Sequence, residues 1–503
     1  MRPYRRGGRR PARVLLASAL AVFVLAGCSD GYAQPQAEGA GDHQSGIGGE
    51  KPPPPKPPRP VDVALGSGSA RQSGGVIAAG GQDAVYNYGP SVMLDGGRTR
   101  MWWCSQYGVA QPAGDDILYA QSPSPDGPFS AAGAVFSGAP GNFDGMHTCD
   151  PSVLRVGSTY YLYYTGAAGD HALGNSVGLA TSTDGEHWTR AGSGAPILNP
   201  SHDVHRDNVY GAGQPSAVYL DGWFYLMFTD TTGKAAGWNG AGQFVLRSRD
   251  PAFGSGVEAA GDHGFAAVAN TASPRTRSVV DAFSSDLMWV GALDAFVIAH
   301  EVDGGTQLSF RTRDFTAQPY LPLLIPGVWK EGPGLVRRPD GHAPLSPAEP
   351  CARVPFDVVR STAIGSAGAP TDLRRFGLDV QGLHACDSQD SLLSTLDGVA
   401  MPSPQRTMDL VTGGKLLRVD RRSVAASLAG ELLGKRLPMI DRLPVAARLS
   451  AAARFVRADA RGIGALIDGR LWPVPDASAA VRNDSTVDLI STQQWDAYPA
   501  GAR

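Results

Sequence analysis

The sequence predicts an all-β fold in which five antiparallel sheets follow one another along the chain, with a small mixed α/β C-terminal module. Two observations carry this prediction. The 503 residues include 64 glycines and 39 prolines, which interrupt helices and populate turns. Short β-branched and aromatic runs recur between these turns over about residues 80–400. Because 42% of the residues are hydrophobic, the chain can still bury a large core.

The charge balance argues against a nucleic-acid partner. Lysine and arginine number 44 and aspartate and glutamate 47, so the formal net charge is −3. Nucleic-acid-binding proteins carry a basic patch or stripe that supplies most of their affinity. With only 18% charged residues and no basic excess, this class of function is excluded.

The N-terminal residues have the pattern of an export signal. A group of arginines precedes the apolar run Val14–Gly27, which is short for a bilayer span. The run ends in Leu25-Ala26-Gly27-Cys28, which resembles the lipobox of a bacterial lipoprotein. This resemblance implies acylation of Cys28 and a lipid anchor in the cell envelope, at the outer membrane of a Gram-negative cell because Ser29 follows. The alternative is a short signal anchor with an incidental cysteine.

Composition divides the chain into four parts. The export signal is followed by a tether rich in proline, most densely in Lys51–Pro60, which we expect to be extended and semi-rigid. The expected boundaries are 1–28 for the signal, 29–62 for the tether, 63–402 for the repeated sheets and 403–503 for a small accessory module.

Four cysteines remain when Cys28 is set aside, an even number that suits disulfides in an oxidising compartment. Three connectivities are open to them. Proximity in sequence favours Cys104–Cys149 and Cys351–Cys386. The sequence has no Cys-x-x-Cys pair, so it gives no support to zinc or redox chemistry and assigns no metal.

One pattern of three strands recurs along the middle of the chain. The first strands begin with Tyr88–Val92, Cys149–Val153, Gly213–Ala217, Ser285–Met288 and Lys330–Pro333. Aromatic second strands are Arg100–Cys104, Tyr160–Tyr164, Phe224–Phe228 and Ala295–Ala299. Third strands are Ile117–Ala120, Val177–Ser182, Phe244–Ser248, Leu308–Thr312 and Val358–Ser361. Five such sheets arranged radially predict a five-bladed β-propeller, with the starts of the first strands around one mouth of an axial channel.

Three motifs give the repeats a family likeness. Asp150-Pro151-Ser152-Val153, Tyr160–Gly166 and Ser182–Trp188 resemble the five-bladed propellers of family 43 glycoside hydrolases, over roughly residues 65–400. The same superfamily holds fructan-, arabinan- and mannoside-active relatives. The resemblance implies a glycosidase that acts on a polysaccharide, a furanoside or pentose polymer of the arabinan or xylan type. Some relatives hold a cation in the axial channel, and no residue pattern here assigns one.

Residues at equivalent positions of the first strands are the candidates for chemistry. The repeat alignment brings together Gly89, Asp150, Gln214 and Asp286, with Glu331 offset by one residue. Glycoside hydrolysis needs one protonated and one ionised carboxyl group, and crowded carboxyls raise each other's pKa. Asp150, Asp286 and Glu331 are therefore the candidate catalytic residues, with Glu331 expected as the acid and an aspartate as the base.

The chain departs from the family pattern at two of three positions. The resemblance implies an Asp base on the first blade, an Asp that tunes pKa on the second and a Glu acid on the third. The corresponding residues here are Gly89, Asp150 and Gln214. Glu331-Gly332-Pro333 looks locally like the acid motif but falls on the fifth blade. A non-catalytic glycan-binding propeller therefore stays open as an alternative to a hydrolase. A third alternative, a scaffold for other envelope proteins, is favoured only by the C-terminal residues.

Other polar and aromatic residues near the strand starts are candidates for binding substrate. Gln214 and His147 are expected to hold sugar hydroxyls, and Asp207 lies in a loop where a solvated residue is the alternative. Tyr88, Trp103 and Tyr210 are each either a stacking platform for a sugar or part of the core. The loop motif His202-Asp203-Val204-His205 has weak metal-ligand spacing. We expect a monomer whose partners are a polysaccharide or oligosaccharide and the membrane.

The residue pattern of the C-terminal module differs from that of the repeats. Apolar positions in Ala446–Phe455 have helical spacing and predict a helix there. Gly464–Val474 predicts two short strands joined by an Asp-Gly turn. A carbohydrate- or envelope-binding accessory role and a structural cap on the propeller are both consistent with this pattern.

Overall fold

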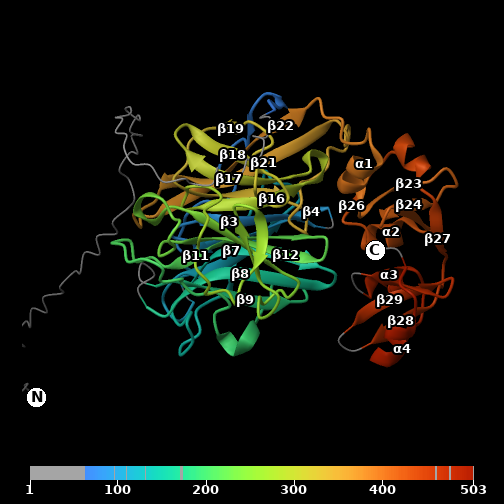
Figure 1. Cartoon of the computed structure of the whole chain (residues 1–503), viewed down its shortest axis with the longest axis horizontal. Helices are drawn as coiled ribbons and strands as arrows, with labels where there is room; N and C mark the ends of the chain where they lie inside the picture. The colour runs from blue at the N-terminus through green and yellow to red at the C-terminus, as the bar shows by residue number, and fades with distance from the viewer. Residues whose placement is uncertain are drawn as a thin grey trace, which may run out of the picture. The chain divides into compact units, whose positions relative to one another are not determined.

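The computed structural model describes residues 63–501 apart from residues 96, 109, 131, 170–173, 459–460 and 475–476 (Figure 1). The export signal with Cys28 and the tether lie outside the described residues. Strands dominate the described part, as expected for an all-β fold. Among the helices that are described, none has the length and apolar character to cross a membrane.

Most strands of the described residues fall into five successive antiparallel groups, of which the first and the fifth are joined in one nine-stranded sheet. The first group contains β3 (Tyr88–Asp95), β4 (Arg98–Ser105), β5 (Asp116–Ser122) and β6 (Gly133–Phe136). The second contains β7 (His147–Val156), β8 (Thr159–Ala167), β9 (Ser176–Ser182) and β10 (Thr189–Arg190). The third contains β11 (Ala212–Leu220), β12 (Trp223–Asp230), β13 (Gln243–Ser248), β14 (Glu258–Gly261) and β15 (Gly264–Ala267).

The remaining two groups complete the series. The fourth contains β16 (Ser285–Val290), β17 (Ala295–Val302), β18 (Gly305–Arg311) and β19 (Leu323–Pro326). The fifth contains β20 (Glu331–Arg337), β21 (Arg353–Ile364) and β22 (Pro370–Gln381). Short 3₁₀ turns η1 (Ala191–Gly194), η2 (Trp238–Gly240) and η3 (Gly291–Leu293) lie between strands.

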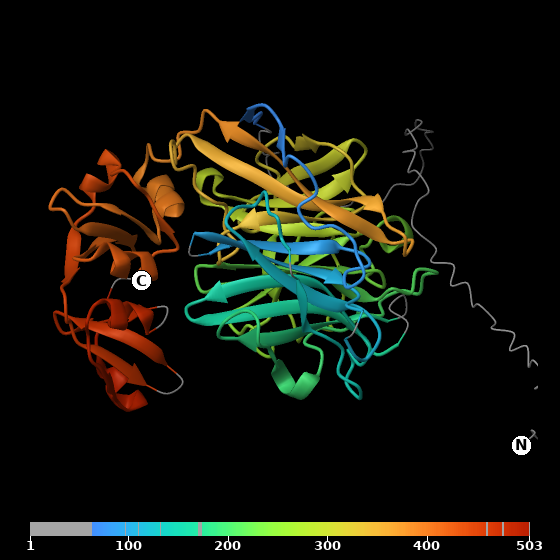
Figure 2. The ribbon, with the colours of Figure 1, turned by 180° about the vertical axis from the view of Figure 1, so that it is seen from behind.

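The two ends of this series meet. Strands β1 (Gly66–Ser67) and β2 (Arg71–Gln72) pair antiparallel with β22, so N-terminal residues supply the outer edge of the fifth group (Figure 2). Strand β20 pairs parallel with β3 through Val336 and Val92. The first strands contact one another in the order β3, β7, β11, β16, β20 and back to β3. They therefore form a closed ring, which brings the starts of distant repeats together.

The strand predictions are confirmed for the first and second strands of the repeats and for four of the third strands. The assignment of Val358–Ser361 as a third strand is wrong, because these residues lie in β21, the second strand of the fifth group. Strand β21 continues as far as Ile364 in a long hairpin with β22. The third strand is therefore β22.

Side chains join the first strands at four of the five junctions of the ring. The Oγ atoms of three serines and one carboxylate oxygen of Asp286 each accept a backbone N–H from the following first strand. The pairs are Ser91 with Val153 at 3.0 Å, Ser152 with Ala217 at 2.9 Å, Ser216 with Leu287 at 2.8 Å, and Asp286 with Leu335 at 2.7 Å. Asp286 therefore occupies the fourth position of a structural series.

A bulge precedes each of the three serines. The pairing register shifts there, and the residue two positions before the serine has a left-handed backbone: Gly89 (φ 53°), Asp150 (φ 47°) and Gln214 (φ 50°). Such bulges re-aim a side chain at the end of a strand, at a cost in backbone strain for residues other than glycine. The corresponding position before Asp286 is Ser284.

Hydrophobic cores fill the spaces between neighbouring groups. One cluster joins Leu154 of β7 with Ala217 and Leu226 of the third group, all fully buried. Each such leucine stabilises the fold by ~1.5–3 kcal/mol. These cores fix the strands whose starts carry the polar residues described below.

The C-terminal residues form two further sheets among the described residues. One contains β23 (Val399–Pro402), β24 (Met408–Thr412), β25 (Lys415–Val419), β26 (Glu431–Leu432) and β27 (Val445–Leu449). The other contains β28 (Phe455–Ala458), β29 (Gly462–Ile467), β30 (Arg470–Val474) and β31 (Val487–Leu489). Helical elements are α1 (Gln389–Leu396), α2 (Arg422–Leu428), η4 (Pro438–Arg442), α3 (Ser478–Arg482) and α4 (Thr492–Ala497).

One prediction for this region is wrong and one is confirmed. The helix expected over Ala446–Phe455 is absent from the described structure, where β27 and the start of β28 take its place. Burial in β27 alternates toward its end, and the strand gains backbone partners by pairing with β25, which overrides helical spacing. The strands expected over Gly464–Val474 are present as β29 and β30, joined at Asp468-Gly469.

Candidate active site

Asp150 lies at the start of β7, where its side chain is partly buried. The Tyr210 hydroxyl lies 3.4 Å from Oδ2, and the Thr165 hydroxyl also hydrogen-bonds to this carboxyl. Burial raises the pKa of Asp150 to about 7, and the negative charges of Glu331 and Asp115 act in the same direction. The two hydroxyls oppose this rise because they stabilise the ionised form. Asp150 is therefore poised to hold or release a proton near neutral pH.

Glu331 lies at the start of β20 and is linked to the third and fourth groups. The Ser284 hydroxyl donates a hydrogen bond to Oε1 at 2.8 Å, and the Gln214 side-chain amide donates to Ser284 Oγ at 2.7 Å. Burial raises the pKa of Glu331, while the hydrogen bond from Ser284 lowers it. This chain of hydrogen bonds fixes the Glu331 carboxyl in one orientation.

Gly89 lies between the two carboxyl-bearing strands. A Cβ atom at Gly89 would be 3.0 Å from Oδ1 of Asp150, and one at Gly332 would be 3.7 Å from the Gly89 Cα. Asp150 and Glu331 therefore come from strands on either side of Gly89. A larger residue at this position would press on the Asp150 carboxyl.

Gln214 takes part in this arrangement through both its backbone and its side chain. Its backbone N–H donates to Thr165 Oγ1 at 2.7 Å, so the hydroxyl next to Asp150 is held by the third group. Its side chain reaches Glu331 through Ser284. Gln214 thus contacts both Thr165, which hydrogen-bonds to Asp150, and Ser284, which hydrogen-bonds to Glu331.

Asp286 does not belong to this pair, and its assignment as a candidate catalytic residue is corrected. Its carboxylate is buried and accepts the N–H of Leu335 at 2.7 Å and a hydrogen bond from Ser216 Oγ. Arg337 Nη1 lies 3.2 Å from Oδ1. Since its oxygens are held by the interior of the ring, Asp286 is a structural residue, and Ser284 takes the position expected for it.

Arg337 lies among the first strands, with 2% of its side chain exposed. Its guanidinium donates to the carbonyls of Ala217 at 3.1 Å and Leu287 at 2.7 Å and pairs with Asp286. The positive charge inside the ring is therefore supplied by this side chain. Asp286 is its counter-ion.

His147 lies three residues before Asp150 at the start of β7. Its Nδ1 atom is 3.1 Å from Oδ2 of Asp115 and accepts the Asp115 backbone N–H at 3.0 Å. The Tyr86 hydroxyl donates to the other oxygen of Asp115. Asp115 thus orients the imidazole beside the site and also contributes to the raised pKa of Asp150.

Of the aromatic residues expected to stack on a sugar, two lie near the carboxyl pair and one lies in the core. Tyr210 contacts Asp150, and the Tyr88 hydroxyl lies 3.4 Å from Cys149 Sγ with its ring partly buried. Trp103 is 1% exposed and donates its indole N–H to Asn87 at 2.6 Å, so its candidacy as a sugar platform is wrong. Asp207 is exposed in the loop before β11.

Two disulfides join the four cysteines, in the pairing that sequence proximity favours. Cys104 of β4 is bonded to Cys149 of β7, which links the first two groups directly beside Asp150. Cys351 and Cys386 join the segment before β21 to the segment after β22. The first disulfide therefore borders the site.

Metal binding at the motif His202–His205 is not supported within the described residues. The Asp203 carboxylate accepts the backbone N–H groups of Lys234 at 3.0 Å and Arg275 at 2.7 Å, so it holds loops together. Metal-type donor atoms gather at Cys104, Asp115 and Cys149 in the described part of the chain, and those cysteines form a disulfide.

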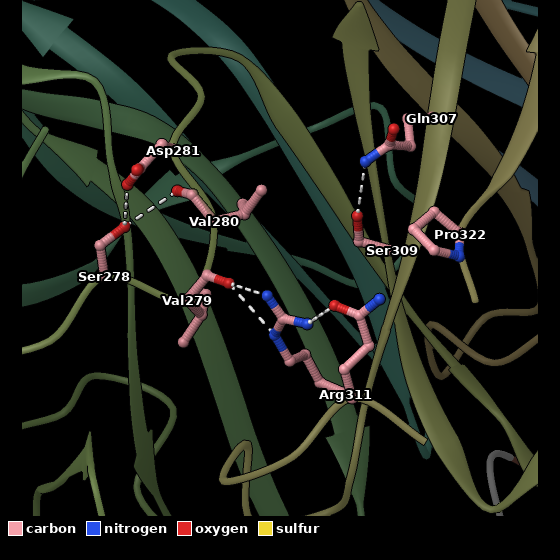
Figure 3. Close-up of a pocket in the computed structure, with 9 residues that line it drawn as sticks. Ser278, Val279, Val280, Asp281, Gln307, Ser309, Arg311 and Pro322 are labelled. Carbon is pink, nitrogen blue, oxygen red and sulfur yellow. Dashed lines mark hydrogen bonds between the residues drawn. The ribbon is translucent and has the colours of Figure 1, made fainter. Parts of the chain in front are cut away.

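Two cavities of about 350 Å³ lie outside the carboxyl pair. One lies between residues 278–281 and β18, where Arg311 donates to the carbonyl of Val279 (Figure 3). The other is lined by the loop before β11, including His202, His205, Asn208 and Val209. This second cavity adjoins Tyr210, the residue that contacts Asp150.

Several site residues were not expected from the sequence. Thr165, Ser284 and Asp115 shape the two carboxyls, and Glu301 is a further buried carboxyl whose pKa burial raises to about 8. Aligning the repeats on Ser91, Ser152 and Ser216 would have placed Ser284 correctly. Thr165 and Asp115 carry no signal of their own in the sequence because they reach the site from neighbouring strands and loops.

No family model and no curated protein matches the chain. Similar solved structures include a family 117 glycoside hydrolase of the marine bacterium Zobellia galactanivorans, at 12% identity and a TM-score of 0.43 over 64% of this chain and 92% of that one. A Podospora anserina α-L-arabinofuranosidase in complex with cellotriose matches at 12% identity and 0.38, covering 64% and 98%. A Coprinopsis cinerea GH62 α-L-arabinofuranosidase matches at 11% and 0.40, covering 63% and 98%. The three neighbours are described as a glycoside hydrolase and two arabinofuranosidases.

Proposed function

We propose that the protein is a glycoside hydrolase that cleaves a polysaccharide with Asp150 and Glu331 as its carboxyl pair. One observation carries this proposal: the two carboxyls flank Gly89, and the charge of Glu331 contributes to raising the pKa of Asp150 to about 7. Hydrolysis of a glycosidic bond needs one carboxyl protonated and the other ionised at the same pH. The raised pKa of Asp150 suits it to be the protonated member of the pair near neutrality.

The surroundings of the carboxyls suggest a role for each. Asp150, with its pKa near 7, donates its proton to the glycosidic oxygen as the bond from that oxygen to the sugar carbon breaks. Ionised Glu331, held by Ser284, removes a proton from the water that attacks the same carbon, or attacks the carbon itself. Water supplies a hydroxyl to one product and a proton to the other. The roles are reversed relative to those expected from the local Glu-Gly-Pro motif.

The proposed substrate is a furanoside or pentose polymer of the arabinan or xylan type. A screen on arabinan, xylan, fructan and mannan with wild type, Asp150→Asn and Glu331→Gln tests both substrate and site. We expect each variant to lose about 10²–10⁴-fold in kcat on the substrate that wild type cleaves. Wild-type turnover of none of these four glycans, or full turnover by both variants, would contradict the proposal.

Aryl glycosides with a good leaving group separate the two roles. Such substrates need little protonation, so Asp150→Asn should recover most of its activity on them. Glu331→Gln should stay inactive because the water or sugar carbon still lacks its base or nucleophile. The opposite pattern would exchange the roles of the two residues without removing the pair.

A non-catalytic glycan-binding protein is the second candidate. Gly89 and Gln214 favour it, because they stand where the family resemblance implies a base and an acid. Calorimetric binding of one of the four glycans without release of reducing ends by wild type would select this function. Release of reducing ends that depends on Asp150 and Glu331 would reject it.

We also propose how the enzyme is built and located. The closed ring of first strands supports a five-bladed propeller, and the expected monomer is checked by analytical ultracentrifugation. The N-terminal sequence supports an acylated Cys28 and attachment to the cell envelope. Labelled palmitate should be incorporated by the full chain in a bacterial host and not by Cys28→Ala. Equal labelling of both would contradict the anchor.

A further inference from the structure

We propose that the cavity beside Tyr210 binds a neutral sugar unit of the glycan, so that the protein grips its substrate beyond the scissile bond. The inference rests on the proposed function and adds a second binding position to it. The cavity of about 350 Å³ has the size of small-ligand sites in proteins. It lies in the loop that precedes β11 and includes His202, His205 and Asn208.

Tyr210 joins this cavity to the carboxyl pair. Its backbone N–H donates to Oδ1 of Asn208, which lines the cavity, at 3.1 Å. Its hydroxyl lies 3.4 Å from Oδ2 of Asp150. One tyrosine side chain therefore separates the cavity wall from the proposed acid. A glycan bound at Asp150 can continue along Tyr210 into the cavity.

The charged groups at the cavity are engaged in hydrogen bonds to the protein backbone. Arg206 lines the cavity, and its guanidinium donates to the carbonyls of Thr231 and Gly233 at 2.9 Å and of Ala236 at 3.1 Å. Asp203 accepts backbone N–H groups from Lys234 and Arg275. No carboxylate lines this cavity in the part of the chain that the structure describes. These features favour a neutral, hydroxyl-rich ligand over an ion.

The groups that remain are suited to a sugar. His202 and His205 are exposed, and an imidazole both donates and accepts hydrogen bonds, as sugar hydroxyls require. Val209, at 40% exposed, offers an apolar wall for C–H groups. Trp238, at 68% exposed, lies on the adjoining loop, where Asn208 Nδ2 donates to the carbonyl of Asn239 at 2.9 Å. An exposed large aromatic beside polar groups is typical of a binding surface.

Substrate length supplies the test. The double variant His202→Ala/His205→Ala and the single variant Trp238→Ala are compared on arabino- and xylo-oligosaccharides of two to six units and on aryl monoglycosides. We expect about a tenfold loss of kcat/KM on the longer oligosaccharides from the loss of one or two hydrogen bonds or a stacking contact. On the aryl monoglycosides the change should stay below about twofold. Equal loss at every length, or no loss at any, would overturn the inference.

Two control variants and a binding measurement complete the design. His263→Ala removes an exposed imidazole at the turn between β14 and β15, and Asp281→Ala alters the other cavity; neither should depend on substrate length. Calorimetry on the same oligosaccharides needs no turnover, so it keeps the two proposals separate. Weaker binding by the cavity variants supports the sugar site even if wild type cleaves nothing. Unchanged binding of the oligosaccharides by the cavity variants would overturn the inference. So would a wild-type protein that binds none of the oligosaccharides, or one that binds Zn²⁺ and no oligosaccharide.

Discussion

The Ser284 hydroxyl donates a hydrogen bond to Oε1 of Glu331 across 2.8 Å, while it accepts one from Gln214 at 2.7 Å. The residue immediately before β16 of the fourth strand group thus joins the third group to the proposed base of the fifth. The hydrogen bond favours the ionised form of Glu331 and opposes the effect of its burial. Ser284 is therefore expected to tune Glu331 without contacting the sugar.

Ser284→Ala should raise the pKa of Glu331, because the donor that stabilises its carboxylate is lost. If Glu331 acts when ionised, the acidic limb of the kcat/KM profile should move to higher pH by up to about one unit, and the alkaline limb should stay in place. Ser285→Ala is the matched control, since Ser285 Oγ is buried without a hydrogen-bond partner among the described residues. An equal shift in both variants, or none in either, would contradict this role.

The raised pKa of Asp150 makes stability depend on pH. In the unfolded chain this carboxyl loses its proton near its ordinary pKa of 3.8, whereas in the folded protein it keeps it until about pH 7. Between these values the folded state binds more protons, so the contribution of Asp150 to the free energy of unfolding falls as pH rises. Asp150→Asn lacks this dependence.

The Tm difference between Asp150→Asn and wild type should therefore grow in favour of the variant from about pH 4 to about pH 7 and level off above it. A gain of about 5 °C is expected for a chain of this size. Scanning calorimetry at matched ionic strength checks this, because titrating groups that do not interact with Asp150 cancel in the comparison. Parallel Tm curves for the two proteins would show that Asp150 has no raised pKa.

Removal of the charge of Asp286, the counter-ion of Arg337, should lower the stability of the fold without lowering the activity. Asp286→Asn leaves the buried guanidinium of Arg337 without its counter-ion, which typically costs ~3–5 kcal/mol of unfolding free energy. Because Asp286 faces the interior of the ring, kcat of the folded variant should stay within about twofold of wild type. Urea unfolding and activity per folded molecule measure the two effects.

An exposed ion pair provides the control for that measurement. Asp221 pairs with Arg313 at the surface, with 65% and 43% of the two side chains exposed. Asp221→Asn should change the unfolding free energy by no more than ~1 kcal/mol. Loss of activity by folded Asp286→Asn, with stability like that of the surface variant, would return Asp286 to the site.

Local sequence patterns predicted the strands well and the site only in part. Runs such as Tyr160–Tyr164 identify strands because alternation and turn residues are local signals. The repeat alignment matches Asp286 to Asp150 because both are acidic and near a strand start. Only the hydrogen bonds between first strands reveal that Asp286 is equivalent to Ser152 instead. A bulge adds a residue to a strand, and it has no reliable signature in a single sequence.

Contacts between different loops and strands are harder to predict from the sequence than the strands themselves. Thr165, near the end of β8, hydrogen-bonds to the Asp150 carboxyl. Asn208, in the loop before β11, accepts a hydrogen bond from the backbone of Tyr210, whose hydroxyl lies next to Asp150. These relations depend on how the second and third strand groups meet. The disulfide Cys104–Cys149 was favoured because proximity in sequence limits the options, and its position beside Asp150 follows from the fold.

The two disulfides should affect stability alike and activity differently. Cys104 and Cys149 are 45 residues apart and Cys351 and Cys386 are 35 apart, so each bond should stabilise the fold by ~2–4 kcal/mol through the unfolded chain. Only the first disulfide includes the residue before Asp150. The variant Cys104→Ser/Cys149→Ser should lose about tenfold in kcat/KM at a temperature where it remains folded, because a small displacement of a reacting group is costly. Cys351→Ser/Cys386→Ser should lose less than twofold under the same conditions, and equal losses in the two variants would show that the first bond has no special part in positioning Asp150.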